Sequence, residues 1–196
     1  MLFAGKQSNV QWIAAFLGNP GQKYQMTRHN AGFLVAEAFE KLHGVRIDRS
    51  KHHALTSVCD VSGQRVLLMK PQTFMNLSGD AVSDAMRFYK VPLDRVLVIS
   101  DDIHLDLGRL RIRPSGSAGG HNGLRDIIAK CGGEGFPRLR VGVGAVPPDW
   151  DQVDWVLSVF HDQDAEDMLK AAERAAEAVG CLIEKGVQEA MNRYNG

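Results

Sequence analysis

The apolar positions of the chain change period several times, from the near-continuous runs of strands to the three-to-four-residue spacing of helices. Residues 10–18, VQWIAAFLG, form a run typical of a strand covered on both faces of a sheet. A loop rich in Asn, Pro and Gly follows, and helical spacing begins at Asn30 and stops at Gly44. The predicted buried face of this helix consists of Phe33, Leu34, Ala38 and Leu42. His29 then lies just before a helix N-terminus.

The middle of the chain predicts a hairpin, a helix and another buried strand. Residues 53–61 and 64–70 flank a Ser-Gly turn, and Pro71 ends the second strand. A helix is predicted from Ser78 until Pro92 stops it. Its apolar positions are Val82, Ala85, Met86 and Tyr89. The apolar strand 95–100 is followed by Asp101 and Asp102, at the end of a strand where open α/β sheets place ligand-binding loops.

The second half of the chain also predicts strands followed by helices. Residues 109–113 alternate basic and apolar side chains as an exposed edge strand does, and the segment SGSAGGHNG leads into a helix over about 124–130. A strand over 137–144, a loop over 145–152 and helices over 165–180 and 187–194 complete the chain. The inward positions of the first of these helices are predicted to be Met168, Leu169, Ala172 and Ala176.

This order of elements predicts an α/β fold: a single domain with a mixed, mostly parallel twisted sheet covered by helices on both faces. The 196 residues fit one such domain, expected to span residues 10–196. Residues 1–9 carry no motif, and we expect them to form a flexible, dispensable extension.

Charge balances overall, with 23 Lys plus Arg against 23 Asp plus Glu, but its distribution is uneven. Between Arg109 and Arg140 seven basic residues stand against two acids, whereas Asp149 to Glu189 holds eleven acids against three bases. The molecule should therefore be electrically polarised, with a basic segment able to face a nucleic acid.

The cysteines and the apolar runs indicate where the protein works. Cys59, Cys131 and Cys181 are odd in number and widely spaced, which suits a reducing cytoplasm and not a disulfide framework. No run approaches the roughly 20 apolar residues needed to span a bilayer. We therefore expect a cytoplasmic protein without a membrane partner.

Polar residues gather at loop-to-element junctions, over residues 19–29, 73–76 and 119–122 and at Asp101. One His, one Asp and three Asn without a Cys nucleophile are the inventory of a water-activating hydrolase. His takes a proton from water near neutral pH, a carboxylate orients it, and carboxamides stabilise an oxyanion or grip a peptide. The alternative for each Asn or Gly is ordinary turn chemistry, and for His29 a capping or packing role.

Three other kinds of site have weaker support. Asp101, Asp102 and His104, or His52 and His53, lack convincing metal-ligand spacing, so no metal is expected. SGSAGGHNG could cradle a phosphate at a helix N-terminus but lacks the Lys and Ser/Thr of a P-loop. A nucleotide-binding domain built on this segment stays a rival interpretation.

Five strings, in this order, resemble the bacterial-type peptidyl-tRNA hydrolase family: FLGNPGQKYQMTRHNAGF, KPQTFMNLSGDAV, VLVISDD, GSAGGHNGLRDII and FPRLRVGVG. The resemblance extends from about Val10 to the C-terminal helices. It implies an enzyme that cleaves the ester between a peptide and the 3′ terminal ribose of tRNA, releasing tRNA for reuse in translation, with no cofactor. The alternative is a non-catalytic RNA-binding protein of the same fold.

The resemblance also implies residue roles. His29 would be the general base, Asp101 would stabilise its working form, and Asn19 would distinguish N-blocked peptidyl esters from free aminoacyl-tRNA. Asn76 and Asn122 would bind the substrate near the scissile bond. Tyr24 and Phe74 would line the same groove, and further candidates for its wall are Met75, Gly119 and His121.

The resemblance also implies a binding partner for the basic segment. Arg111, Arg113, Arg138 and Arg140 would contact the tRNA phosphate backbone without reading sequence, with Arg125 and Lys130 nearby. We expect a monomer. His104 stands where the family commonly has an acidic residue, and this difference bears on the hydrogen bonds around Asp101.

Overall fold

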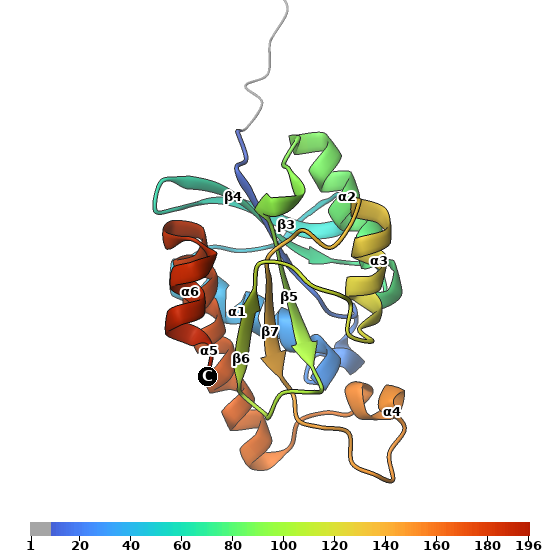
Figure 1. The fold of residues 1–196 in the computed structure, drawn as a ribbon. Coiled ribbons are helices and arrows are strands. Elements are labelled where there is room, and N and C mark those ends of the chain that lie inside the picture. The colour runs from blue at the N-terminus through green and yellow to red at the C-terminus, as the bar shows by residue number, and fades with distance from the viewer. Residues whose placement is uncertain (1–8) are drawn as a thin grey trace, which may run out of the picture.

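A central sheet of seven strands organises the computed structural model, which describes residues 9–196 (Figure 1). The strand order is β2-β3-β4-β1-β5-β7-β6. The bounds of the strands are β1 Trp12–Phe16, β2 Arg49–Lys51, β3 Ala54–Val61, β4 Gln64–Pro71, β5 Val96–Asp102, β6 Leu110–Arg113 and β7 Arg138–Gly142. The predicted extension over residues 1–9 falls almost entirely outside the described residues.

The four central strands, β4, β1, β5 and β7, run parallel, and antiparallel pairs close both edges. β1 is buried along its whole length, as its apolar run predicts. β3 and β4 form the predicted hairpin, with Val61 paired to Gln64. The sheet is therefore mixed with a parallel centre, which confirms the predicted fold class.

Helices cover both faces of the sheet (Figure 1). The α-helices are α1 Ala31–His43, α2 Ser78–Tyr89, α3 Asn122–Cys131, α4 Gln152–Leu157, α5 Asp162–Lys185 and α6 Val187–Tyr194. The core on one face includes α1, α5 and α6, and the core on the other includes α2 and α3. Gly44 takes the left-handed conformation that ends α1, as predicted.

Several predicted bounds and faces differ from the structure. Leu42 and Leu169 are 55% and 48% exposed, so both were wrongly placed on buried faces. α5 extends past Gly180 because Cys181, Leu182 and Ile183 pack into the core and outweigh the low helix propensity of glycine. Lys90 in the left-handed conformation ends α2 two residues before Pro92.

Two short elements were not predicted. β2 is an exposed edge strand of three residues, too short to give a period. α4 begins where the predicted loop ends, because the Asp151 carboxylate accepts from the backbone N–H groups of Val153 and Asp154. Among the described residues, no helix is long and apolar enough to cross a membrane.

Candidate active site

The predicted polar residues meet at the carboxyl ends of the neighbouring parallel strands β1 and β5. β1 leads through Asn19 to a 3₁₀ turn over Arg28–Asn30, which supplies His29. β5 ends on Asp101 and Asp102, which are its last two residues and not the loop after it. α3 begins at Asn122, about two residues earlier than predicted, so that His121 is its N-cap. Three segments that are far apart in the sequence thus meet at the carboxyl ends of the parallel strands.

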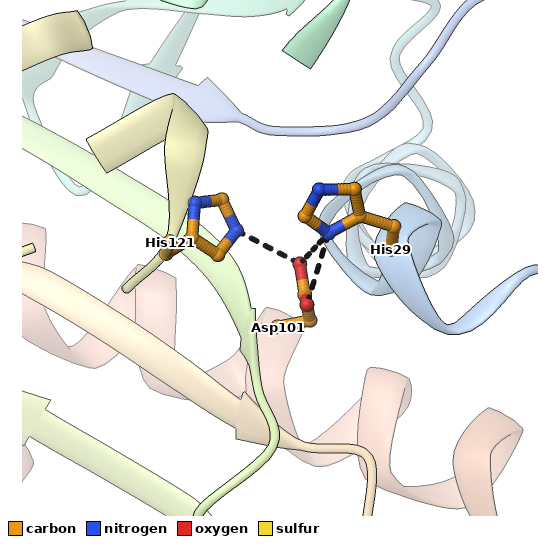
Figure 2. Close-up of side chains that lie close together, drawn as sticks. All are labelled: His29, Asp101 and His121. Atoms are coloured by element: carbon orange, nitrogen blue, oxygen red, sulfur yellow. Dashed lines mark hydrogen bonds and ion pairs between the residues drawn. The ribbon is translucent and has the colours of Figure 1, made fainter. Parts of the chain in front are cut away.

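Asp101 binds two histidines on one carboxylate (Figure 2). Nδ1 of His29 lies 2.9 Å from Oδ1 and 3.0 Å from Oδ2 of Asp101. Nε2 of His121 lies 2.9 Å from the same Oδ1. All three residues are buried, and the two imidazole centroids lie 5.0 Å apart. His121 was predicted only as part of a substrate wall, and the structure adds this contact with Asp101.

The hydrogen bonds of His121 fix its tautomer. Its Nδ1 accepts from the backbone N–H of Leu124, so Nε2 carries the hydrogen that it donates to Asp101. The same reasoning applies to His29, whose Nδ1 donates to an ionised carboxylate. His29 therefore presents Nε2 as a free acceptor when it is neutral.

The charges of this cluster change its protonation equilibria. Burial disfavours the ionised form of Asp101, but the charges and hydrogen bonds of His29 and His121 outweigh burial and hold its pKa well below the usual range. Burial acts to lower the pKa of His29, yet the charge and hydrogen bond of Asp101 outweigh this effect and raise that pKa above 6.5. Asp101 stays ionised, and His29 changes charge at a pH above its ordinary value.

A cavity of about 50 Å³ lies over these side chains and is lined by His29, Gly119, Asn122 and Val153, among others. That volume holds at least one water molecule. Among residues 9–196, Nε2 of His29 has no hydrogen-bond partner and is not among the fully buried unpaired atoms. A basic nitrogen therefore borders a space that admits water.

Asn19 is held in place by hydrogen bonds with Asn30. The Asn30 carboxamide accepts from the backbone N–H of Asn19 at 2.8 Å and donates to its carbonyl at 3.0 Å. Oδ1 of Asn19 accepts from the backbone N–H of Met75 at 2.9 Å. This bond leaves the Asn19 NH₂ group without a protein partner among the described residues. Asn30 was not singled out in the sequence, because an Asn at a helix start also has a capping interpretation.

The remaining candidate binding residues surround this centre at different depths. Asn122 lines the cavity, and its Oδ1 accepts from Arg125 at 3.2 Å. Asn76 is exposed in the 3₁₀ turn Met75–Leu77, and Phe74, which precedes it, is 56% exposed. Tyr24 is half-buried in the turn Gln22–Tyr24. Of the three predicted Asn residues, only Asn122 shares the cavity with His29.

One predicted tRNA contact is wrong. Arg138 is 2% exposed, and its guanidinium donates to the backbone carbonyls of Ser117, Glu134 and Phe136. Burial lowers its pKa to about 10, with a smaller effect from Arg140. A side chain enclosed in this way supports the glycine-rich loop and does not reach a phosphate. The strand predicted over residues 137–144 did not indicate how deeply this side chain lies.

The neighbouring arginines are more accessible. Arg113 is exposed on the edge strand β6 and Arg111 is half-buried, whereas Nε of Arg140 lies 3.0 Å from Oδ2 of Asp102. His104 is exposed, and its backbone N–H donates to Oδ1 of Asp102 at 2.9 Å. The departure at His104 therefore leaves the hydrogen bonds of Asp101 intact.

Arg28, next to His29, is a further functional candidate that the sequence did not reveal. Its guanidinium stacks 3.8 Å above the Trp155 ring and donates to the Val143 carbonyl at 2.8 Å. It also pairs with Asp164 at 3.1 Å. Arg28 thus joins α4, which lines the cavity, to the turn that carries His29. Such a partner set only becomes visible once the chain has folded.

His29, Asp101 and His121 also place three potential metal-ligand atoms within 4.8 Å of one another. A metal bound there would occupy the carboxylate that orients His29. The alternative clusters weighed in the sequence, at His104 and at His52 and His53, do not form such a group within residues 9–196.

Comparisons with known proteins identify relatives of this chain. A family model described as peptidyl-tRNA hydrolase matches residues 13–196. The peptidyl-tRNA hydrolase of Caldanaerobacter subterraneus subsp. tengcongensis is 49% identical over 94% of this chain and 100% of its own length. That of Lachnospira eligens is 45% identical with the same coverage. The crystal structure of the Acinetobacter baumannii enzyme superposes with a TM-score of 0.88 at 34% identity, covering 96% of both chains.

Proposed function

Because the chain belongs to the peptidyl-tRNA hydrolase family, we propose that it hydrolyses the ester between peptide and tRNA with His29 as general base and Asp101 as its orienting partner. The observation that carries this assignment is the pair of contacts from Nδ1 of His29 to the Asp101 carboxylate, at 2.9 and 3.0 Å. These contacts direct Nε2 toward the cavity side.

In the proposed reaction, water in the cavity gives a proton to Nε2 of His29 and attacks the ester carbonyl carbon. Asp101 stabilises the imidazolium that forms. When the tetrahedral intermediate collapses, the bond to the ribose oxygen breaks and the imidazolium returns the proton to that oxygen. The peptide leaves as its carboxylic acid, which then loses the second water proton to solvent, and free tRNA leaves with His29 neutral again. General-base assistance of this kind contributes about 10²–10⁴-fold.

The amides supply binding and selectivity. With Oδ1 of Asn19 bonded to Met75, its NH₂ group is left as a donor toward the substrate. This NH₂ group can donate a hydrogen bond to the carbonyl oxygen of a peptide group, whereas it repels a free ammonium. This difference supports the role of Asn19 in selecting N-blocked esters. Asn122 would hold the ester in the cavity, and Asn76, Tyr24 and Phe74 would contact the substrate from the rim.

For the tRNA backbone we retain Arg111 and Arg113, which lie on the edge strand with side chains at the surface or half-buried. All three members of the His29 cluster come from one chain, which supports action as a monomer. We also propose that no metal takes part, because a cation on Asp101 would compete with the contact that orients His29.

The test measures release of tRNA from N-acetyl-aminoacyl-tRNA and from the same aminoacyl-tRNA with a free amine, with excess chelator present. We expect hydrolysis of the blocked ester and much slower hydrolysis of the free one. Failure to hydrolyse either ester, with tRNA binding intact, would favour the non-catalytic RNA-binding alternative. Loss of activity in chelator that one metal restores would contradict the metal-free mechanism.

A further inference from the structure

A second pocket of about 230 Å³ is lined by Asn19 and Asn30, among others, and shares no lining residue with the cavity over Asp101. It lies between the loop after β1, the first turns of α1 and the end of the β3–β4 hairpin. Three side chains of its α1 wall, Asn30, Phe33 and Glu37, are spaced three and four residues apart and therefore share one helix face. The pocket is thus continuous with the amide network that holds Asn19.

The two charged side chains of this pocket differ in whether they form an ion pair. Within the described chain, its lining holds two charged residues, Glu37 and Lys70. Lys70 is already paired with Glu40 at 3.1 Å, and the other oxygen of Glu40 accepts from the backbone N–H of Ile47. Glu37 is exposed and has no ion-pair partner among residues 9–196. A carboxylate without an ion pair therefore lines the pocket together with Gln22, Gln25 and Gln72. Partial desolvation raises the pKa of Glu37, while the positive charge of Lys70 in the same lining acts to lower it.

The length of the pocket fits a peptide. Glu37 follows Asn30 by seven residues, which places it about 10 Å farther along the α1 axis. An extended peptide covers about 3.3–3.6 Å per residue, so about three residues bridge this distance. A peptide whose esterified residue is held near Asn19 and Asn30 would bring its second or third upstream residue to Glu37.

We infer that this pocket is a subsite for the peptide part of the substrate, in which Glu37 binds an ammonium or guanidinium group carried two or three residues upstream of the ester. The cation is either a Lys or Arg side chain or the α-ammonium of a short peptide. This assignment rests on the proposed hydrolysis, since it concerns the same substrate. It gives the enzyme a preference among peptides in addition to recognition of the tRNA.

The test uses synthetic peptidyl-tRNAs with one tRNA and an otherwise all-glycine acetylated peptide. Lysine is compared with acetyl-lysine at the first, second and third residue upstream of the esterified one, and kcat/KM is measured for each. We expect lysine to be favoured about threefold at the second or third position, the scale of an exposed ion pair, and not at the first. A parallel pair, triglycyl-tRNA with and without N-acetylation, shows whether an α-ammonium is favoured as well.

Two variants that remove the same negative charge distinguish binding in the subsite from long-range attraction by the net charge of the protein. Glu37→Gln should abolish the preference for lysine, whereas Glu166→Gln, an exposed acid on α5, should retain it. Equal rates for lysine and acetyl-lysine at every position in the wild type, or a preference that persists in Glu37→Gln, would overturn the subsite. Absence of hydrolysis with all these substrates would instead contradict the proposed function itself, so the two failures are distinguishable.

Discussion

Asp101 is buried and accepts hydrogen bonds from two histidines, so its negative charge governs the protonation of His29. The sequence predicted the pairing of His29 with Asp101 through the family resemblance, and the structure places them in contact across 72 positions of chain. The second histidine was missed as a partner because nothing in the local pattern of GGHNG distinguishes an N-cap from a residue that contacts a distant carboxylate.

The raised pKa of His29 predicts the pH dependence of the reaction. Nε2 accepts a proton only when the imidazole is neutral, so kcat/KM should rise with pH through a midpoint above 6.5. Asp101→Asn removes the charge that raises this pKa while burial still lowers it. The midpoint in this variant should therefore move to lower pH, and the plateau should fall by about 10²–10⁴-fold. A midpoint that stays in place would show that Asp101 does not control the base.

At the scale of elements, the site depends on how closely α1 approaches the sheet. Gly32, in the first turn of α1, lies so near that a Cβ there would sit 2.6 Å from the Leu17 nitrogen and 2.8 Å from the Ile99 carbonyl oxygen. This contact fixes the start of the helix, and with it His29 three residues earlier, against the ends of β1 and β5.

Gly32→Ala should therefore lower the free energy of unfolding by about 1–3 kcal/mol, as overpacking does, and also lower kcat by displacing His29. Gly135→Ala is the matched control, because nothing lies within 4 Å of a Cβ there. Its stability should change by no more than about 0.5 kcal/mol. Urea unfolding and tRNA release measure the two effects, and equal behaviour of both variants would refute the role of this contact.

The neighbouring strands β6 and β7 carry two kinds of arginine. Arg113 and Arg138 are paired in register on β6 and β7, yet the first is exposed and the second is enclosed by three backbone carbonyls. Arg113→Ala should weaken tRNA binding and reduce the slope of log K against log salt by about one. Arg138→Met should leave that slope unchanged and lower the melting temperature. The measurement is a set of tRNA-binding titrations at several salt concentrations. A smaller slope of log K against log salt in Arg138→Met, with the slope unchanged in Arg113→Ala, would contradict these assignments.

These elements also show what the sequence could predict. The strand ending at Phe16 was identified from a continuous apolar run, and the helix ending at His43 from the period that one buried face imposes on its sequence. β2 and α4 are too short to show one. Leu169 was misplaced because α5 buries an alanine-rich face, and a hydrophobicity pattern favours Leu over Ala. The depth of Arg138 depends on loops packed over the strand, which no local pattern records.

At the scale of the whole molecule, the His29 cluster, the arginines of β6 and the pocket at Glu37 follow from one sheet. Parallel central strands bring His29, Asp101 and the amides to a single edge, while the antiparallel edge strand β6 carries Arg111 and Arg113. The chain matches its relatives over nearly its full length and theirs, so the whole domain is shared with the family. We therefore expect loss of the base to stop the chemistry while leaving tRNA binding intact.

The most direct test compares wild type and His29→Ala on N-acetyl-aminoacyl-tRNA, measuring tRNA release and, separately, binding of uncharged tRNA. The account predicts a loss of about 10²–10⁴-fold in kcat with tRNA affinity unchanged, because His29 is buried beside Asp101 and away from the exposed arginines of β6. Hydrolysis by His29→Ala at the wild-type rate, with tRNA still bound, would contradict the assignment of His29 as the base.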